Sequence, residues 1–155
     1  MNAAHLHLML NHFPVVGLMF ALAILGWSVF RRNASLTKTG FAALVTVAVL
    51  AIPAFLTGEP AEKIAEDLPG VSDPIIEQHE DAAKVALVVT LAAGVAALAG
   101  LWFSRGKAVA GWCSSSALVL AVVAAGLMAW TANLGGKVRH TEIRTTAPSG
   151  SAHED

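Results

Sequence analysis

The chain has 155 residues and a formal net charge of −1, with 55% hydrophobic and 14% charged residues. Soluble globular domains carry about 25% charged residues. This composition is therefore outside the usual range of a soluble domain and favours a membrane protein. The sequence holds no basic patch with interleaved aromatic residues, and nucleic-acid binding is therefore not expected. Cys113 is the single cysteine, which excludes an intramolecular disulfide.

Four apolar stretches follow one another along the chain, and each is long enough to approach or cross a hydrocarbon core of about 30 Å. They cover Phe13–Phe30, Gly40–Thr57, Ala82–Phe103 and Ala108–Asn133. Positive charges follow the first stretch instead of preceding it, which indicates a retained helix and not a cleaved signal peptide. The sequence therefore predicts an all-α fold in which residues 1–144 form an integral membrane four-helix bundle. Residues 145–155 are polar and turn-forming, and we expect a disordered C-terminal tail there.

Charges are segregated between the segments that join these stretches. The first and third connections are basic and carry no acid: they hold Arg31, Arg32, Lys38, Arg105 and Lys107. The positive-inside rule places both connections in the cytoplasm. The N-terminus, the loop Gly58–Asp81 and the C-terminal tail then face outward with all 11 acidic residues. We therefore expect an integral membrane protein, surrounded by membrane lipid, with both termini outside.

The loop between the second and third stretches contains a short helical pattern that begins at Glu59-Pro60. The residues that share its apolar face are Ala61, Ile64, Ala65 and Leu68. A short amphipathic helix of this kind is expected to lie on the membrane surface or over the mouth of the bundle. The third long helix is expected to begin with Asp73 as its N-cap.

The fourth stretch carries small residues at four-residue spacing, namely Ala117, Ala121, Ala125 and Ala129. Such a ridge lets a neighbouring helix approach closely, which is how helices pack where the hydrophobic effect cannot drive association. The helix is expected to end at Asn133. Gly135-Gly136 is then expected to turn the chain back and to bring Arg139 and His140 to the mouth of the bundle.

Histidines gather on the side of the bundle that is expected to face outward. They are His5, His7, His12, His79 and His140, with His153 in the tail on the same side. His12 is the most deeply placed, and an ionisable side chain at the start of an apolar run is expensive unless it faces the bundle interior and has a partner. A single histidine at a membrane interface can also be a side chain that extends to water and takes no part in metal or haem binding. The one-sided cluster nevertheless indicates a metal or haem centre, with Glu59 and Glu80 as candidate acceptors for a ligating imidazole.

The relation between the N-terminal histidines depends on Asn2–Leu10, which either continue the first helix or form a separate interfacial one. In a continuous helix His5 and His12, seven residues apart, share a face. His7 and His12, five residues apart, point about 140° apart, so they serve two neighbouring sites more easily than one ion.

Motifs along residues 7–140 resemble the bacterial membrane-protein domain-of-unknown-function family 2231. The family has a histidine, a His-Phe-Pro five residues later, an outer histidine before the third helix, and a Gly-Gly turn before a last histidine. The matching residues are His7, His12-Phe13-Pro14, His79, Leu134-Gly135-Gly136 and His140. The chain departs from the pattern at Leu8, where the family has proline, at Thr141, where it has glycine, and in its long acidic outer loop. The resemblance implies a protein of the bacterial inner (cytoplasmic) membrane. The family has no settled activity, but the resemblance also implies a haem-associated protein, and similar domains beside iron–sulfur or cytochrome modules imply redox chemistry.

The leading class of function is a b-type cytochrome that holds one or two haem b groups between helices and transfers electrons on the outer side. A redox partner protein or a larger membrane complex would then be its partner. His12 and His79 are expected to ligate one haem iron, while His7 and His140 ligate a second haem or hydrogen-bond the first. The cations expected to neutralise the haem propionates are Lys137 and Arg139.

Two other classes of function remain open. One is a non-haem Zn, Cu or Fe site with histidine and glutamate ligands. The other is a structural or assembly subunit of a larger membrane complex, in which the histidines are pH-sensitive or packing groups. No nucleophile–base pair, phosphate loop or nucleotide motif in the sequence indicates an independent enzyme.

Overall fold

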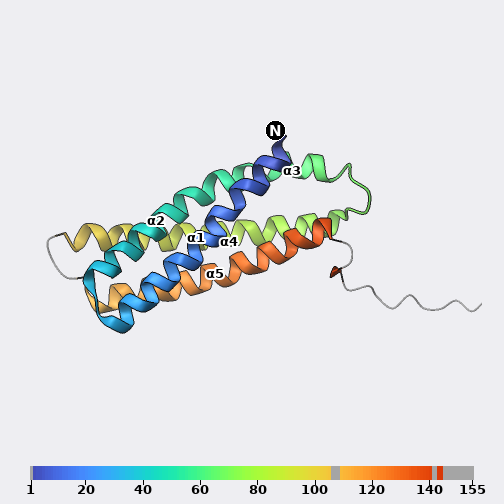
Figure 1. The fold of residues 1–155 in the computed structure, drawn as a ribbon. Helices are drawn as coiled ribbons and strands as arrows, with labels where there is room; N and C mark the ends of the chain where they lie inside the picture. Colours follow the sequence, from blue (N-terminus) through green and yellow to red (C-terminus); the bar gives the residue numbers. More distant parts are fainter. Residues whose placement is uncertain (1, 106–108, 141–142, 145–155) are drawn as a thin grey trace, which may run out of the picture.

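A computed structural model describes residues 2–105, 109–140 and 143–144. These residues contain five α-helices and no strand: α1 (Ala3–Arg31), α2 (Ala34–Leu56), α3 (Gly58–Ala65), α4 (Asp73–Phe103) and α5 (Gly111–Arg139). Figure 1 shows the four long helices side by side, with α3, the start of α1 and the end of α5 at one end. The predicted all-α fold with a short helix before the third long one is confirmed for this part of the chain. The predicted disordered tail, 145–155, lies outside the described residues.

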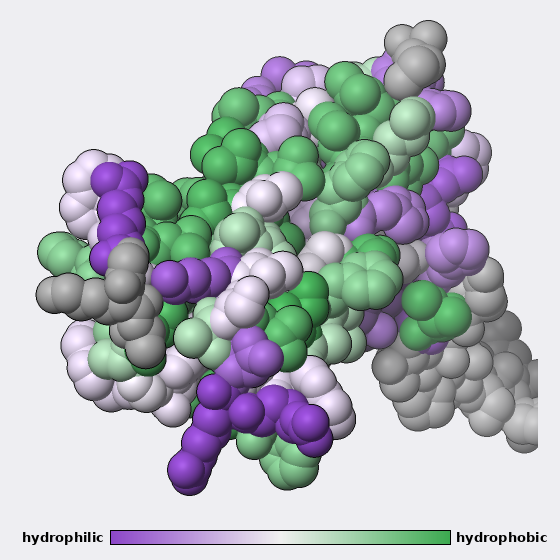
Figure 2. Space-filling view, turned by 60° about the vertical axis from the view of Figure 1, so that its left-hand side comes forward, coloured by the Kyte–Doolittle hydropathy of each residue, from purple (hydrophilic) through white to green (hydrophobic). Residues whose placement is uncertain are grey.

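Four helical segments of the described chain are long and apolar enough to cross a membrane: α1, α2 continued through α3, α4 and α5. They contain 29 to 32 residues, so at 1.5 Å per residue each is about 44 to 48 Å long, longer than a hydrocarbon core of about 30 Å. Large apolar side chains such as Phe20, Val95 and Trp112 are exposed on them. Hydrophobic residues cover much of the surface in Figure 2. Length, composition and surface are all compatible with a membrane protein.

The first helix is continuous from the N-terminal region through Pro14. The Asn2 side chain caps it by accepting a hydrogen bond from the His5 N–H at 2.9 Å, which satisfies one of the backbone donors left free at a helix start. It ends at Arg31, because Arg32 adopts the left-handed conformation with φ 49° and Asn33 caps α2. Residues 3–10 therefore continue the first helix, and the alternative of a separate interfacial helix is wrong.

The core is built mainly from small residues, which let the helix backbones approach closely. Leu18, Leu25, Phe41 and Leu44 are the largest apolar side chains with less than 2% exposure, and alanines make up most of the other buried apolar residues. Gly94 on α4 lies so close to α2 that a Cβ atom there would overlap the Ala48 methyl group. The crossing of α2 and α4 thus depends on the absence of a side chain at Gly94.

The predicted alanine ridge of the fourth helix is only partly correct. Ala117 and Ala121 are buried, but Ala125 is half-buried and Ala129 is exposed, while Ala124 is fully buried. Four residues advance about 40° beyond one full turn, so a strict four-residue spacing rotates away from the core. The three-residue step from Ala121 to Ala124 brings the helix face back.

Ala121→Leu should lower the free energy of unfolding by roughly 1–3 kcal/mol, the usual cost of overpacking a filled core. Ala121 has 0% exposure, so the added side chain has no open space. Thermal melting of the detergent-solubilised protein measures the effect. Ala129→Leu on the exposed face of the same helix is the control and should leave stability nearly unchanged. Equal stability of both variants would contradict this packing.

Two predicted helix boundaries are wrong. Ser72, not Asp73, is the N-cap of α4, and Asp73 is the first helical residue. The fourth long helix does not end at Asn133: α5 runs on to Arg139, so Gly135 and Gly136 are helical and form no turn. Glycine lowers helix stability, but at Gly135 the absence of a side chain makes room for the imidazole ring of His79 on α4.

Candidate functional site

A cavity of about 500 Å³ lies at the end of the bundle where α1 begins and α5 ends. Its walls come from the start of α1, the end of α2, α3, the start of α4 and the end of α5, the region at the right of Figure 1. Its volume falls in the range of roughly 300–1,000 Å³ typical of small-molecule and cofactor sites. Two histidines line it, His7 from α1 and His79 from α4, together with Glu62, Glu80 and Arg139.

The His7 ring is held by the outer end of α2. Its Nδ1 atom lies 3.0 Å from the Ala54 carbonyl oxygen and 3.2 Å from the Thr57 hydroxyl oxygen. A carbonyl only accepts, so Nδ1 carries the hydrogen and donates it, and the neutral ring keeps its lone pair on Nε2. Ala54 belongs to the last turn of α2, and its carbonyl also accepts a hydrogen bond from the Thr57 hydroxyl at 2.9 Å. The end of α2 therefore supplies the acceptor that orients His7.

The His79 ring is held in the same way by α5. Its Nδ1 atom lies 3.0 Å from the Thr131 carbonyl oxygen, so here too Nδ1 donates and Nε2 keeps the lone pair. The half-buried ring also packs directly on Gly135, where a Cβ atom would lie 3.0 Å from the His79 Cε1 atom. Both imidazoles in the cavity are thus fixed in the tautomer that ligates through Nε2, the arrangement in which a second hydrogen bond orients a metal ligand.

The two glutamates expected to orient a histidine do not do so. Glu59 pairs with Lys63 at 2.9 Å and Glu80 pairs with Lys84 at 3.3 Å. Each pair is one helical turn apart, where side chains meet readily, and main-chain carbonyls take the role of acceptors for the imidazoles. That part of the sequence interpretation is wrong, although Glu59 and Glu80 do line the cavity.

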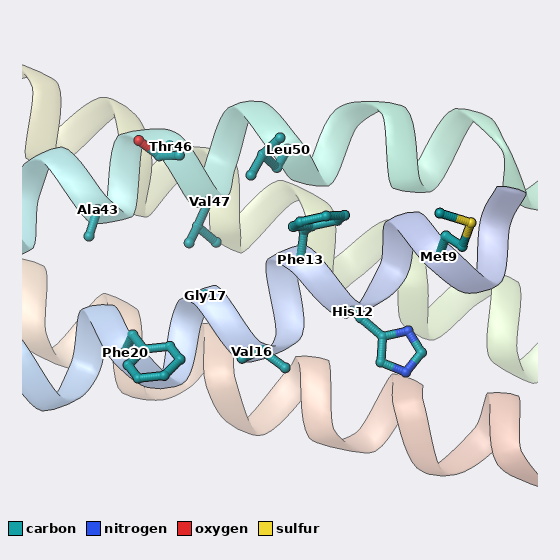
Figure 3. Close-up of a pocket in the computed structure, with 10 residues that line it drawn as sticks. All are labelled: Met9, His12, Phe13, Val16, Gly17, Phe20, Ala43, Thr46, Val47 and Leu50. Carbon is teal, nitrogen blue, oxygen red and sulfur yellow. The ribbon is translucent and has the colours of Figure 1, made fainter.

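His12 lies on a different face of α1 from His7. Its side chain is exposed, and its Nδ1 atom contacts the Leu8 carbonyl of its own helix. It lines a separate groove of about 550 Å³ between α1 and α2, together with Met9, Phe13 and other apolar residues, as Figure 3 shows. The structure therefore brings His7, and not His12, to the cavity of His79. The separation of about 140° between positions five residues apart is the reason.

His5 and His12 line a further small crevice together, so the expectation that they share a face of a continuous helix is confirmed. His140 is the C-cap of α5, where its N–H donates to the Gly136 carbonyl at 3.0 Å, and its side chain is exposed. Arg139 lines the cavity, whereas Lys137 is half-buried and is not one of the residues that line it. His153 lies outside the described residues.

Sequence reasoning missed Arg144, which ties the end of α5 to the loop before α4. Its guanidinium donates to the Lys137 carbonyl at 2.7 Å, to the Val138 carbonyl at 2.8 Å and to the Gly70 carbonyl at 2.7 Å. The signal was present, because arginine beyond a helix C-terminus often satisfies the last carbonyls. Arg144 therefore holds together two of the segments that border the cavity.

Within residues 2–105, 109–140 and 143–144, no group of three or more His, Cys, Asp or Glu side chains is arranged to hold a metal ion. Two imidazoles, His7 from α1 and His79 from α4, line the same cavity. Comparison of the sequence with protein-family models and with curated proteins finds no match. Comparison of the structure with solved structures finds none either.

Proposed function

We propose that this chain is an integral protein of the bacterial inner membrane, with both termini and the histidine cavity on the outer side. Four helical segments of sufficient length and apolarity support the membrane location. The basic connections after α1 and α4, which contain Arg31, Arg32 and Arg105, support the orientation through the positive-inside rule. In this arrangement α3 covers the outer mouth of the bundle.

Cysteine labelling of spheroplasts tests the orientation. In a Cys113→Ala background, a membrane-impermeant maleimide should label a Glu66→Cys variant and leave a Lys38→Cys variant unlabelled until the membrane is permeabilised. Glu66 is exposed near the end of α3, and Lys38 lies near the opposite end of the bundle. Labelling of Lys38→Cys alone would reverse the orientation and place the cavity in the cytoplasm.

In this proposed membrane orientation, the protein is a membrane-anchored b-type haem protein that transfers electrons on the outer side. One observation carries it: His7 and His79 line one cavity, and each donates from Nδ1 to a helix carbonyl, so each has its Nε2 lone pair for a ligand. Two imidazoles match the two axial positions of a haem iron. The pair His7 and His79 replaces the pair His12 and His79 as the proposed axial ligands.

The residues around the cavity fit such a group. The haem itself would supply one-electron chemistry, while the chain holds the imidazoles, excludes water with apolar side chains and offers a cation. Ile64, Ala83 and Val138 are among the apolar lining residues, and Arg139 is a cation at the same cavity that would pair with a propionate. The motif resemblance to family 2231 points in the same direction. The electron partner would be an outer redox protein or a neighbouring subunit of a larger membrane complex.

Haem titration of the purified protein tests this proposal. Protein prepared in detergent without haem should bind haem with a stoichiometry of one per chain, and elemental analysis should find iron in the same ratio. Haem binding of unchanged affinity after both His7 and His79 are replaced would contradict the proposed ligand pair.

A non-haem metal site is the second candidate: Glu62 and Glu80 line the same cavity as the two histidines, although no three of these side chains in the described residues are arranged to hold a metal ion. Histidine nitrogen and carboxylate oxygen are common ligands of Zn, Cu and Fe. Stoichiometric zinc or copper without haem would favour this candidate. Protein with neither haem nor metal, prepared with both in adequate supply, would favour a structural subunit of a larger complex.

A further inference from the structure

The two imidazoles of the cavity are oriented by the same local arrangement, which occurs once in each pair of long helices. In the pair α1–α2, His7 donates to the carbonyl of Ala54, and the residue four positions later is Gly58. In the pair α4–α5, His79 donates to the carbonyl of Thr131, and the residue four positions later is Gly135. A histidine near the start of one helix thus reaches a carbonyl near the end of the next.

The glycine four residues after the acceptor has a steric reason. In an α-helix each side chain leans toward the N-terminus and covers the turn before its own Cα atom. A side chain at position 135 would therefore cover the carbonyl at position 131. In agreement, a Cβ atom at Gly135 would lie 3.0 Å from Cε1 and 3.3 Å from Nδ1 of His79. At Gly58 the contact would be looser, 3.8 Å from the His7 Cε1 atom.

We propose that Gly135 is a positioning residue for His79: it leaves the Thr131 carbonyl open to the ring and so fixes the ring with Nε2 available to the ligand. This inference rests on the proposed function for the identity of the ligand, but the orientation of the ring is a property of the chain alone. It also explains why α5 keeps a glycine in its interior, where glycine is otherwise unfavourable. Gly58 has the equivalent place beside His7 with more space.

The orientation of the ring is tested without any haem, by nitrogen NMR of ¹⁵N-histidine-labelled protein in detergent, with His79 assigned through a His79→Gln variant. In the unaltered protein His79 should be the Nδ1–H tautomer. Gly135→Ala should change the tautomer ratio of His79, since the added methyl group requires the ring to shift by a few tenths of an ångström and so weakens its hydrogen bond to the Thr131 carbonyl. Gly126→Ala is the matched control on the same helix, because a Cβ atom there meets nothing within 4 Å, and it should leave the His79 signal unchanged.

Haem affinity gives the second readout. Loss of a hydrogen bond that orients a ligand typically costs 10–100-fold in affinity, so Gly135→Ala should bind haem about 10–100-fold more weakly, while Gly126→Ala should bind it normally. If His79 in the unaltered protein were the Nε2–H tautomer, the positioning role of Gly135 would be overturned. This measurement does not depend on whether the Gly135→Ala variant folds. A correct tautomer without haem binding would instead reject the proposed function and leave the positioning of His79 in place.

Discussion

Haem binding should be lost when either His7 or His79 is replaced by alanine. Each variant removes one of the two imidazoles that line the cavity, so the iron would lose one axial ligand and the low-spin spectrum of a bis-imidazole haem should disappear. The affinity for haem should fall by at least the 10–100-fold seen when only an orienting contact is lost. Haem titration followed by visible spectroscopy measures both effects.

His5→Ala and His12→Ala are the matched controls, because both rings are on α1 and exposed, and neither lines this cavity. Both variants should retain haem and its spectrum. If His12→Ala abolished the spectrum while His7→Ala kept it, the ligand assignment drawn from the structure would be wrong, and the sequence-based choice of His12 would be correct.

Gly94→Leu should destabilise the bundle strongly. Gly94 lies where α4 crosses α2, and even a methyl group there would overlap Ala48 and approach the Leu44 carbonyl at 3.7 Å. The backbones of two packed helices must then separate, which places the expected loss of unfolding free energy at or above the upper end of the usual overpacking cost of about 1–3 kcal/mol. Thermal melting in detergent, or unfolding in a denaturing detergent, measures the loss.

The neighbouring position supplies the control for this substitution. Val95 is 67% exposed, so Val95→Leu changes the same helix on its outer face and should alter stability by less than about 0.5 kcal/mol. If Gly94→Leu were as stable as Val95→Leu, the close crossing of α2 and α4 would be contradicted.

Most of the fold follows from hydropathy and charge. The apolar stretches mark the four long helices correctly, but they understate the first one, which runs from Ala3 to Arg31 and not only from Phe13 to Phe30. Hydropathy detects the part of a helix that can lie in lipid, whereas backbone hydrogen bonding continues into polar residues such as Asn11 and His12. The end of α5 was missed because Gly135-Gly136 signals a helix end locally, whereas in the structure α5 continues to Arg139 and the His79 ring packs on Gly135.

The candidate site was predictable only in part. The segregation of histidines and acids to the same side of the predicted bundle indicates which end carries the candidate site. It does not show which imidazoles meet, because that depends on the rotation of α1 about its axis and on the partners available at the ends of α2 and α5. His12 was chosen for its depth in the sequence, yet the Ala54 carbonyl fixes His7 inside the cavity and leaves His12 on another face. Acceptors such as the Thr131 carbonyl carry no signal in residue type.

Haem ligation by His7 and His79 is best tested by the visible absorption spectrum of the full chain, purified in detergent from cells with adequate haem and recorded oxidised and reduced. We expect a six-coordinate, low-spin haem with two imidazole ligands in both states, at one haem per chain. A fully helical preparation without haem absorbance, or one whose haem is five-coordinate and high-spin in both states, would contradict it.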